Sequence, residues 1–284
     1  MERKTRTAKF IILRTLKHFV LIFAVFFTAL PFISMVGTAI KEKSVALAST
    51  SLLPTSLDQV SFESFYTVLF KTTFGQNIIN SLVVAITAVI LCTIVAALAG
   101  YAISRFRGRF FDFYSVMLLV LQMFPTVLIL IPIFIVFTNI GLVDTLYSVI
   151  ITYATVNLAF STWMLKGFFD SIPNELEEAA MIDGCAKFKA FWRIVLPLAL
   201  PGIATVAIFT FINAWNEYTM ASIFLRGDTV MTMTVGLQKF VQQNTSDWTR
   251  LMAASTIGTI PALLFLFFTQ RFLIAGMTAG AVKG

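Results

Sequence analysis

Long apolar runs separated by short polar segments make up most of the chain. A helix needs about 20 apolar residues to cross about 30 Å of hydrocarbon, and six stretches meet that requirement. The predicted spans are residues 19–39, 78–101, 113–137, 146–165, 198–225 and 251–275. The pattern therefore predicts an all-α membrane protein with six transmembrane helices.

Composition supports this class. Apolar residues make up 58% of the chain, charged residues only 12%, and the mean hydropathy is +0.88. Charge this sparse cannot cover the surface of a soluble domain of 284 residues. The net charge of +7 does not indicate nucleic-acid binding, because the basic residues lie between apolar runs and form no single patch.

Residues that often carry chemistry are scarce. His18 is the only histidine, so this chain cannot build a zinc site on paired histidines or a proton relay of several histidines. Cys92 lies in an apolar run and Cys185 in a polar one, which gives no disulfide framework or metal-ligand spacing. There is no HExxH pair and no nucleophile with a histidine base. The sequence predicts a protein that is not an enzyme.

Basic residues predict the orientation. Six precede the first apolar run, as in a signal peptide, but that run is long and lacks a clear small-residue cleavage site, so we expect a retained span. Alternate connecting segments hold fifteen Lys or Arg, against six in the others. Because basic segments are retained in the cytoplasm, both termini are predicted to be cytoplasmic.

This topology divides the chain into three parts. They are a cytoplasmic N-terminal segment (1–18), a six-span domain (19–275) with a cytoplasmic loop at 166–197, and a cytoplasmic tail (276–284). The longest outer loop, residues 40–77, carries apolar residues at helical spacing: Phe62, Phe65, Tyr66 and Leu69. They predict an amphipathic helix that lies on the membrane or on a partner.

The cytoplasmic loop contains the most polar stretch of the chain, EEAAMIDGCAKFKAFWRIVLP at 177–197. Pro173 fits the first turn of a helix, and the acids after it favour the positive pole of that helix. Ala179 and Asp183, and likewise Ala180 and Gly184, lie four residues apart. A helix therefore has a face of small side chains here that another backbone can approach closely. Gly184 is a natural helix stop.

A second, amphipathic helix is predicted after Gly184. Its apolar face consists of Phe188, Phe191, Trp192 and Val195. Pro197 and Pro201 are then expected to break or kink the chain before the fifth span. Spacing alone leaves two roles open for this loop, floating on lipid headgroups or docking in a protein groove.

The loop resembles the EAA loop of the membrane permeases of ATP-binding-cassette importers. The matching residues are Glu178, Ala179, Ala180, Asp183 and Gly184, followed after nine residues by Ile194, Leu196 and Pro197. Three further stretches resemble the maltose-transporter branch of that family: LQMFP (121–125), FINAWNEY (211–218) and QRFLIAGMTAGAVKG (270–284). The resemblance covers nearly the whole chain and implies the fold of a type I importer permease.

The resemblance also implies partners. The matched loop residues, together with Glu177, would couple this subunit to a dimer of cytoplasmic ATPase subunits. A second, related permease would complete the pore, and an extracytoplasmic sugar-binding protein would deliver the substrate. The chain has no GxxxxGK[ST] phosphate loop, so we expect it to bind no cofactor and the partner to bind ATP.

A few polar residues lie inside the predicted spans, where they usually face a protein interior or an aqueous path. The candidates for a substrate path or gate are Gln122, Asn157, Asn213, Trp215, Asn216 and Glu217. Each amide could instead join helices by hydrogen bonds, and Trp215 could stack on a sugar or belong to the interfacial belt. Small residues in the second span, among them Gly100, predict close helix packing.

The resulting hypothesis is the permease subunit of a sugar importer in the cell membrane of a prokaryote, working by alternating access. An importer of amino acids, phosphate or polyamines shares the EAA loop and is the main alternative. A secondary transporter or channel that acts alone is a further one. The sequence names neither the sugar nor the partner subunits.

Overall fold

The computed structural model describes residues 2–243 and 247–281, nearly all of them in helices or short connections. The extended pairing within these residues is one isolated antiparallel bridge between Lys41 and Val60. The helices form two compact units. One is built from the chain up to Thr72 together with Lys239–Gly258, and the other from Thr73–Gln238 together with the chain from Thr259 onward.

The first unit contains the N-terminal helix and most of the long loop. Its elements are α1 (Glu2–Ala39), α2 (Lys43–Ala48), the 3₁₀ turn η1 (Leu57–Gln59) and α3 (Glu63–Phe70). The α1 helix runs without a break through the predicted boundary at residue 18. The amphipathic helix predicted in the loop forms as α3, but Phe62 and Tyr66 are exposed while Thr67 and Val68 are buried. The predicted stripe is therefore divided, because Phe65 and Leu69 are half-buried while Phe62 and Tyr66 are on the surface.

An ion-pair cluster on Asp247 stabilises the first unit. Its carboxylate lies 3.1 Å from the Lys43 ammonium and 3.2 Å from the Arg250 guanidinium. Burial raises the pKa of this carboxyl, but hydrogen bonds from Lys43 and Thr249 outweigh burial, so the net shift of the pKa is downward.

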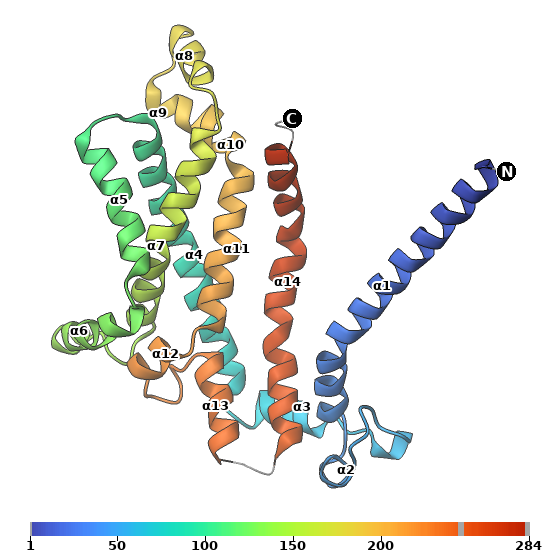
Figure 1. The fold of residues 1–284 in the computed structure, drawn as a ribbon. Coiled ribbons are helices and arrows are strands. Elements are labelled where there is room, and N and C mark those ends of the chain that lie inside the picture. The colour runs from blue at the N-terminus through green and yellow to red at the C-terminus, as the bar shows by residue number, and fades with distance from the viewer. Residues whose placement is uncertain (1, 244–246, 282–284) are drawn as a thin grey trace. The chain divides into compact units, whose positions relative to one another are not determined.

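The second unit holds the helices that matter for function, and Figure 1 shows α4, α7 and α11 running alongside one another, with α5 against α7. Its elements are α4 (Phe74–Arg105), α5 (Arg109–Met123), α6 (Thr126–Asn139), α7 (Leu146–Asp170), α8 (Glu175–Ile182), α9 (Lys187–Ala190), the π-helical turn η2 (Phe191–Val195), α10 (Leu196–Leu198), α11 (Leu200–Asn216) and α12 (Thr219–Phe224). Two further helices, α13 (Met233–Gln243) and α14 (Trp248–Ala281), belong partly to each unit. Within the second unit, α8 and α9 lie at one end of the bundle and α6 and α12 at the other (Figure 1).

The six predicted spans correspond to four long helices and two bent pairs. By length and composition, α1, α4, α7 and α14 are long and apolar enough to cross a membrane. The pair α5 and α6 is bent by 96°, and the segment Lys187–Leu198 is bent by 72° against α11. The all-α multi-span fold is confirmed, but the third predicted span is a bent pair of helices. The fifth, residues 198–225, is interrupted between α11 and α12, and its bent pair begins earlier in the chain, at Lys187.

Proline explains the break in the third predicted span. Phe124 and Pro125 are both extended, with ψ of 128° and 115°, and α6 begins directly after them. Proline has no N–H to continue a helix, and its ring disfavours the helical conformation of the residue before it. The expected bend between Pro197 and Pro201 is also present, and it falls at Ala199.

Helices α4 and α7 pack closely because α4 presents small residues to α7, as the second predicted span led us to expect. The buried members of that set are Ala85, Ala88, Ala96, Ala97 and Gly100. At Gly100 an added Cβ would lie 3.1 Å from the backbone N of Lys166 and 3.1 Å from the carbonyl of Thr162. Backbone atoms cannot rotate away, so Gly100 sets the distance between the two helices.

The tight turn between α6 and α7 is held by Asp144, whose φ of 66° is unusual for a residue with a side chain. Its carboxylate accepts the backbone N–H groups of Arg226 and Gly227, each at 2.8 Å, and its own N–H donates to the Phe224 carbonyl at 2.8 Å. The hydrogen bonds from Gly227 and Arg226 hold the pKa of this carboxyl below its usual value.

Replacing Gly100 by leucine is expected to destabilise the protein by about 1–3 kcal/mol, because the α7 backbone must move to admit the side chain. The matched control is Gly167→Leu, since an added Cβ at this helical glycine meets no atom within 4 Å. Thermal melting of the purified protein in detergent distinguishes the two. Equal melting temperatures for both variants would contradict this account of the α4–α7 contact.

Candidate functional site

Helix α8 begins at an acidic first turn and carries the residues predicted for coupling. The Asn174 carbonyl accepts the backbone N–H groups of Glu177 and Glu178 at 2.9 and 3.1 Å. The acids of the first turn lie at the positive pole of the helix, as predicted. Pro173, in contrast, was predicted inside the first turn and lies just before the N-cap, because the helix begins only at Glu175.

Gly184 ends α8 with a Schellman motif. The Gly184 N–H donates to the Met181 carbonyl at 3.0 Å, and the Cys185 N–H donates to the Ala180 carbonyl at 2.9 Å. The φ of Gly184 is +85°, in the region that favours glycine. Nothing lies within 4 Å of a Cβ added there, so backbone conformation rather than space requires glycine.

The predicted second amphipathic helix is not a regular α-helix. Residues Phe191–Val195 form a π-helical turn between α9 and α10. The predicted apolar face is also divided: Phe191 and Val195 are buried, whereas Phe188 and Trp192 are 68% and 52% exposed. The wider π turn lets half of this face pack on the bundle and leaves the other half on the surface.

The predicted coupling residues fall into three groups by burial. The exposed ones are Glu178, Ala179, Asp183, Gly184 and Pro197. Ile194 and Leu196 are half-buried, and Glu177 and Ala180 are buried. Apart from Pro197, which belongs to α10, the exposed residues lie on α8 or directly after it, so this helix and its C-terminal end present them.

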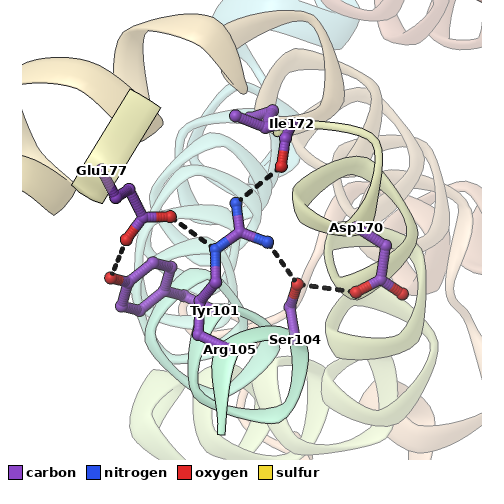
Figure 2. Close-up of polar contacts among 6 residues, drawn as sticks. All are labelled: Tyr101, Ser104, Arg105, Asp170, Ile172 and Glu177. Carbon is purple, nitrogen blue, oxygen red and sulfur yellow. Dashed lines mark hydrogen bonds and ion pairs between the residues drawn. The ribbon is translucent and has the colours of Figure 1, made fainter. Parts of the chain in front are cut away.

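Glu177 is the acid of this loop whose carboxylate points into the bundle (Figure 2). One carboxylate oxygen accepts Nε–H of Arg105 at 2.5 Å, and the other accepts the Tyr101 hydroxyl at 2.6 Å. The remaining guanidinium nitrogens donate to the Ser104 hydroxyl at 3.1 Å and to the Ile172 carbonyl at 3.0 Å. The Arg105 and Glu177 side chains are only 6% and 5% exposed, and each nitrogen of the guanidinium and each oxygen of the carboxylate has a hydrogen-bond partner.

Two neighbouring side chains extend this network along α7. The Ser104 hydroxyl donates to one oxygen of Asp170 at 2.6 Å, and the Lys166 ammonium lies 2.6 Å from the other. The Lys166–Asp170 pair joins one turn of α7 to the next and is partly exposed. Surface pairs of this kind contribute little to stability.

Tyr101 connects the network to the apolar core. Its ring packs on Phe169 of α7 at 5.8 Å and on Phe191 of η2 at 4.5 Å between ring centroids. Both neighbours belong to one buried cluster with Leu165 and Val195. Through its ring and its hydroxyl, Tyr101 of α4 therefore contacts α7, η2 and α8.

Sequence reasoning missed this network. Arg105 was interpreted only as part of the basic signal for orientation, and Tyr101, Ser104 and Asp170 were not singled out. The signal that was available is Tyr101 four residues before Arg105 at the end of an apolar helix, which places both side chains on one face. Their partner Glu177 lies 72 residues after Arg105 in the chain, and local spacing cannot reveal a contact between residues so far apart.

Three of the predicted path residues line one cavity of about 660 Å³ between α5, α6, α7 and α11. They are Gln122, Asn157 and Asn213, and the remaining wall is largely apolar, including Phe160 and Phe209. The side-chain amide N–H of Asn213 donates to Oδ1 of the Asn157 side chain at 2.9 Å. A mainly apolar cavity with a few amides is typical of a small-molecule path.

Glu217 lies outside the helix in which the sequence placed it. Helix α11 ends at Asn216, and Glu217 is extended with ψ of 127°, although both lie within the predicted fifth span. The Glu217 carboxylate accepts the Tyr153 hydroxyl at 2.6 Å and the backbone N–H groups of Met220 at 2.9 Å and Ala221 at 3.2 Å. It therefore caps α12 and fastens the break to α7, beside a smaller cavity of about 200 Å³.

Trp215 and Asn216 line neither of these two cavities. The Trp215 ring is 2% exposed and stacks on Phe211 at 5.6 Å between centroids, and Phe211 stacks on Phe265. A buried ring cannot stack on a sugar in this conformation, so Trp215 packs α11. The Asn216 amide donates to the Ile212 carbonyl of its own helix at 3.0 Å.

The described residues contain no group of three or more His, Cys, Asp or Glu that could hold a metal ion. The polar residues within the bundle instead bond to one another. Ser161 of α7 lies 3.4 Å from the Cys92 sulfur of α4 and 3.5 Å from the Thr210 hydroxyl of α11. These bonds join the three central helices, which is the alternative role that polar residues in spans were expected to have.

Glu217→Ala is expected to cost about 0.5–2 kcal/mol of stability through loss of the cap, and Glu217→Gln to cost less, because one oxygen still accepts the N–H groups. Thermal melting in detergent gives the order of the two losses. Asn216→Ala is the matched control, since among the described residues its side chain bonds to the Ile212 carbonyl of the same helix. A wild-type melting temperature for Glu217→Ala would show that the carboxylate does not hold the break.

Comparisons with known proteins identify the family to which the chain belongs. Residues 90–278 match the family described as binding-protein-dependent transport system inner membrane component. The inner membrane ABC transporter permease protein YcjP of Escherichia coli (strain K12) is 37% identical over 265 residues, which cover 90% of this chain and 92% of the relative. The maltodextrin transport system permease protein MalD of Streptococcus pneumoniae (strain ATCC BAA-255 / R6) is 31% identical, covering 89% of this chain and 90% of the relative.

Among solved structures, a bacterial ABC transporter involved in the import of the acidic polysaccharide alginate superposes with a TM-score of 0.79. At 22% identity it covers 92% of this chain and 96% of its own, and it supports the fold of a type I ABC importer permease. The EAA resemblance, the family match and this fold lead to one conclusion: the chain belongs to the family of binding-protein-dependent transport system inner membrane components.

Proposed function

We propose that the chain is one permease subunit of an ATP-driven importer that carries a sugar or oligosaccharide. The observation that carries the proposal is the cavity beside α7 and α11, lined by the amides of Gln122, Asn157 and Asn213 and by aromatic rings. Amides bond to hydroxyl groups in either direction, and apolar walls suit the faces of sugar rings. The maltodextrin permease among its relatives supports the same substrate class.

The exposed surface of α8 is the docking site that we propose for the cytoplasmic ATPase. Together with the adjoining α9, it combines the acids Glu178 and Asp183 with exposed apolar side chains: Ile182 at the end of α8 is 87% exposed, and Phe188 of α9 is 68% exposed. A short helix with apolar and charged positions fits a groove in a partner. Glu177 faces inward, so its contribution to coupling would be to hold α8 in place rather than to contact the ATPase.

The remaining partners follow from the same proposal. A related second permease would cover the apolar surfaces that this subunit exposes, and an extracytoplasmic binding protein would deliver the sugar. The end of the bundle with α8 would face the cytoplasm, because the basic segments gather there. ATP would be bound and hydrolysed by the ATPase dimer, and this chain would contribute a path and a lever.

Glu178→Lys and Gly184→Val are expected to leave the protein inserted but to uncouple transport from ATP hydrolysis. The first reverses a charge on the docking surface, and the second forces a branched residue into a conformation that costs about 1–2 kcal/mol. Glu175→Lys is the matched control at the exposed start of the same helix. Uptake and ATP hydrolysis are measured in proteoliposomes at equal membrane abundance, and normal uptake in both variants would refute the assignment of this loop.

The substrate is tested by purifying the chain in mild detergent, identifying the subunits that remain bound, and measuring uptake of labelled monosaccharides and oligosaccharides by the reconstituted complex. We expect an ATPase and a second permease to co-purify, and uptake to require ATP. A chain that purifies alone and transports alone with an ion gradient would overturn the proposal. ATP-dependent uptake of an amino acid, phosphate or a polyamine in place of sugar would correct the substrate class.

A further inference from the structure

Helix α8 has a narrow attachment to the bundle. It packs against α9 and η2, which follow it in the chain, and it stands at the end of the second unit (Figure 1). Its polar connection to α4 consists of three side chains, Tyr101, Arg105 and Glu177 (Figure 2). A force applied to α8 can therefore reach α4 directly through this connection, or indirectly through η2 and through the short chain connection to α7, which packs on α4.

The geometry of these side chains makes the connection stiff. The guanidinium of Arg105 donates to three acceptors in different places, namely Glu177 of α8, Ser104 of α4 and the Ile172 carbonyl after α7. A planar group held in three directions cannot rotate without breaking a bond. Both charged side chains are almost fully buried, and hydrogen bonds inside a protein are electrostatically stronger than in water.

We propose that Tyr101, Arg105 and Glu177 pass the displacement of α8 to α4, so that the two helices move as one body during transport. This inference rests on the proposed function, in which a docked ATPase moves α8. The three residues are positioning residues, because none of them reaches the exposed surface of α8 or the large cavity. Tyr101 couples the same movement to Phe169 and Phe191 through its ring.

The neighbouring pair Lys166–Asp170 provides a matched control. It has the same kind of charges and lies beside the network, but both residues belong to α7 and Lys166 makes no bond to α8 in the described structure. Removing the Lys166 charge therefore changes a residue beside the buried network but leaves the bonds between α4 and α8 intact.

The test measures the distance between the two helices in the assembled complex. Spin labels are attached to cysteines at Glu175 of α8 and at Thr73, just before α4, in a Cys92→Ala and Cys185→Ala background, and distances are recorded with and without a non-hydrolysable ATP analogue. In the otherwise unchanged chain, we expect one narrow distance that the analogue does not shift. Arg105→Met combined with Glu177→Gln removes both charges together, and in that variant we expect the distance to shift or broaden when the analogue binds.

Lys166→Met is expected to behave as the unchanged chain. Tyr101→Phe keeps the ring and removes only the hydroxyl bond to Glu177, and we expect it to broaden the distance when the analogue binds. This variant replaces the double variant as the test if the double variant fails to assemble. The inference would be overturned if the distance in the unchanged chain already responds to the analogue. It would also be overturned if the distance stays narrow in the double variant, or in Tyr101→Phe where the double variant fails to assemble. Failure of any ATPase to co-purify would instead refute the proposed function.

Discussion

A break in a membrane helix leaves backbone N–H groups that find no water in hydrocarbon, and each unpaired group costs several kcal/mol. This constraint explains much of the second unit. The break after α11 persists because the Glu217 carboxylate accepts the N–H groups of Met220 and Ala221. The Tyr153 hydroxyl donates to the same carboxylate, so the group that accepts the free N–H groups at the break also bonds the break to α7. A residue that the sequence suggested for the substrate path or gate is thereby used to make an irregular backbone possible.

Helix α7 connects the two places where function is proposed, the large cavity and the network at α8. Asn157 of α7 lines the large cavity, and Phe169 of α7 packs on Tyr101 beside the α8 network. Twelve residues of helix separate them, which corresponds to about 18 Å. Close packing at Gly100 keeps α4 against α7 over this length. Movement at α8 and a change in the cavity can therefore be linked by rigid helices, without a relay of individual side-chain movements.

The sequence predicted the helices well, because apolar length decides whether a segment can span a membrane. It predicted the acidic start and glycine end of α8 for the same local reason, since caps depend on residues one turn away. It failed where the answer depends on residues far apart in the chain. The partner of Arg105 follows the α7 helix, and the end of α11 depends on Tyr153, so neither could be found by spacing. Trp215 showed the remaining limit: an aromatic residue near polar ones does not reveal whether its ring faces the path or the core.

A buried ion pair is a costly way to hold two helices together. Well-packed apolar residues of similar volume often give equal or greater stability, while removing one partner alone costs about 3–5 kcal/mol. Stability therefore does not explain why Glu177 faces Arg105, when its neighbour Ala180 and the ring of Tyr101 already pack on the bundle. Apolar contacts are non-directional and would let α8 slide or rotate on its support. The guanidinium fork fixes one orientation, and a fixed orientation is what a helix needs if it is to transmit a force.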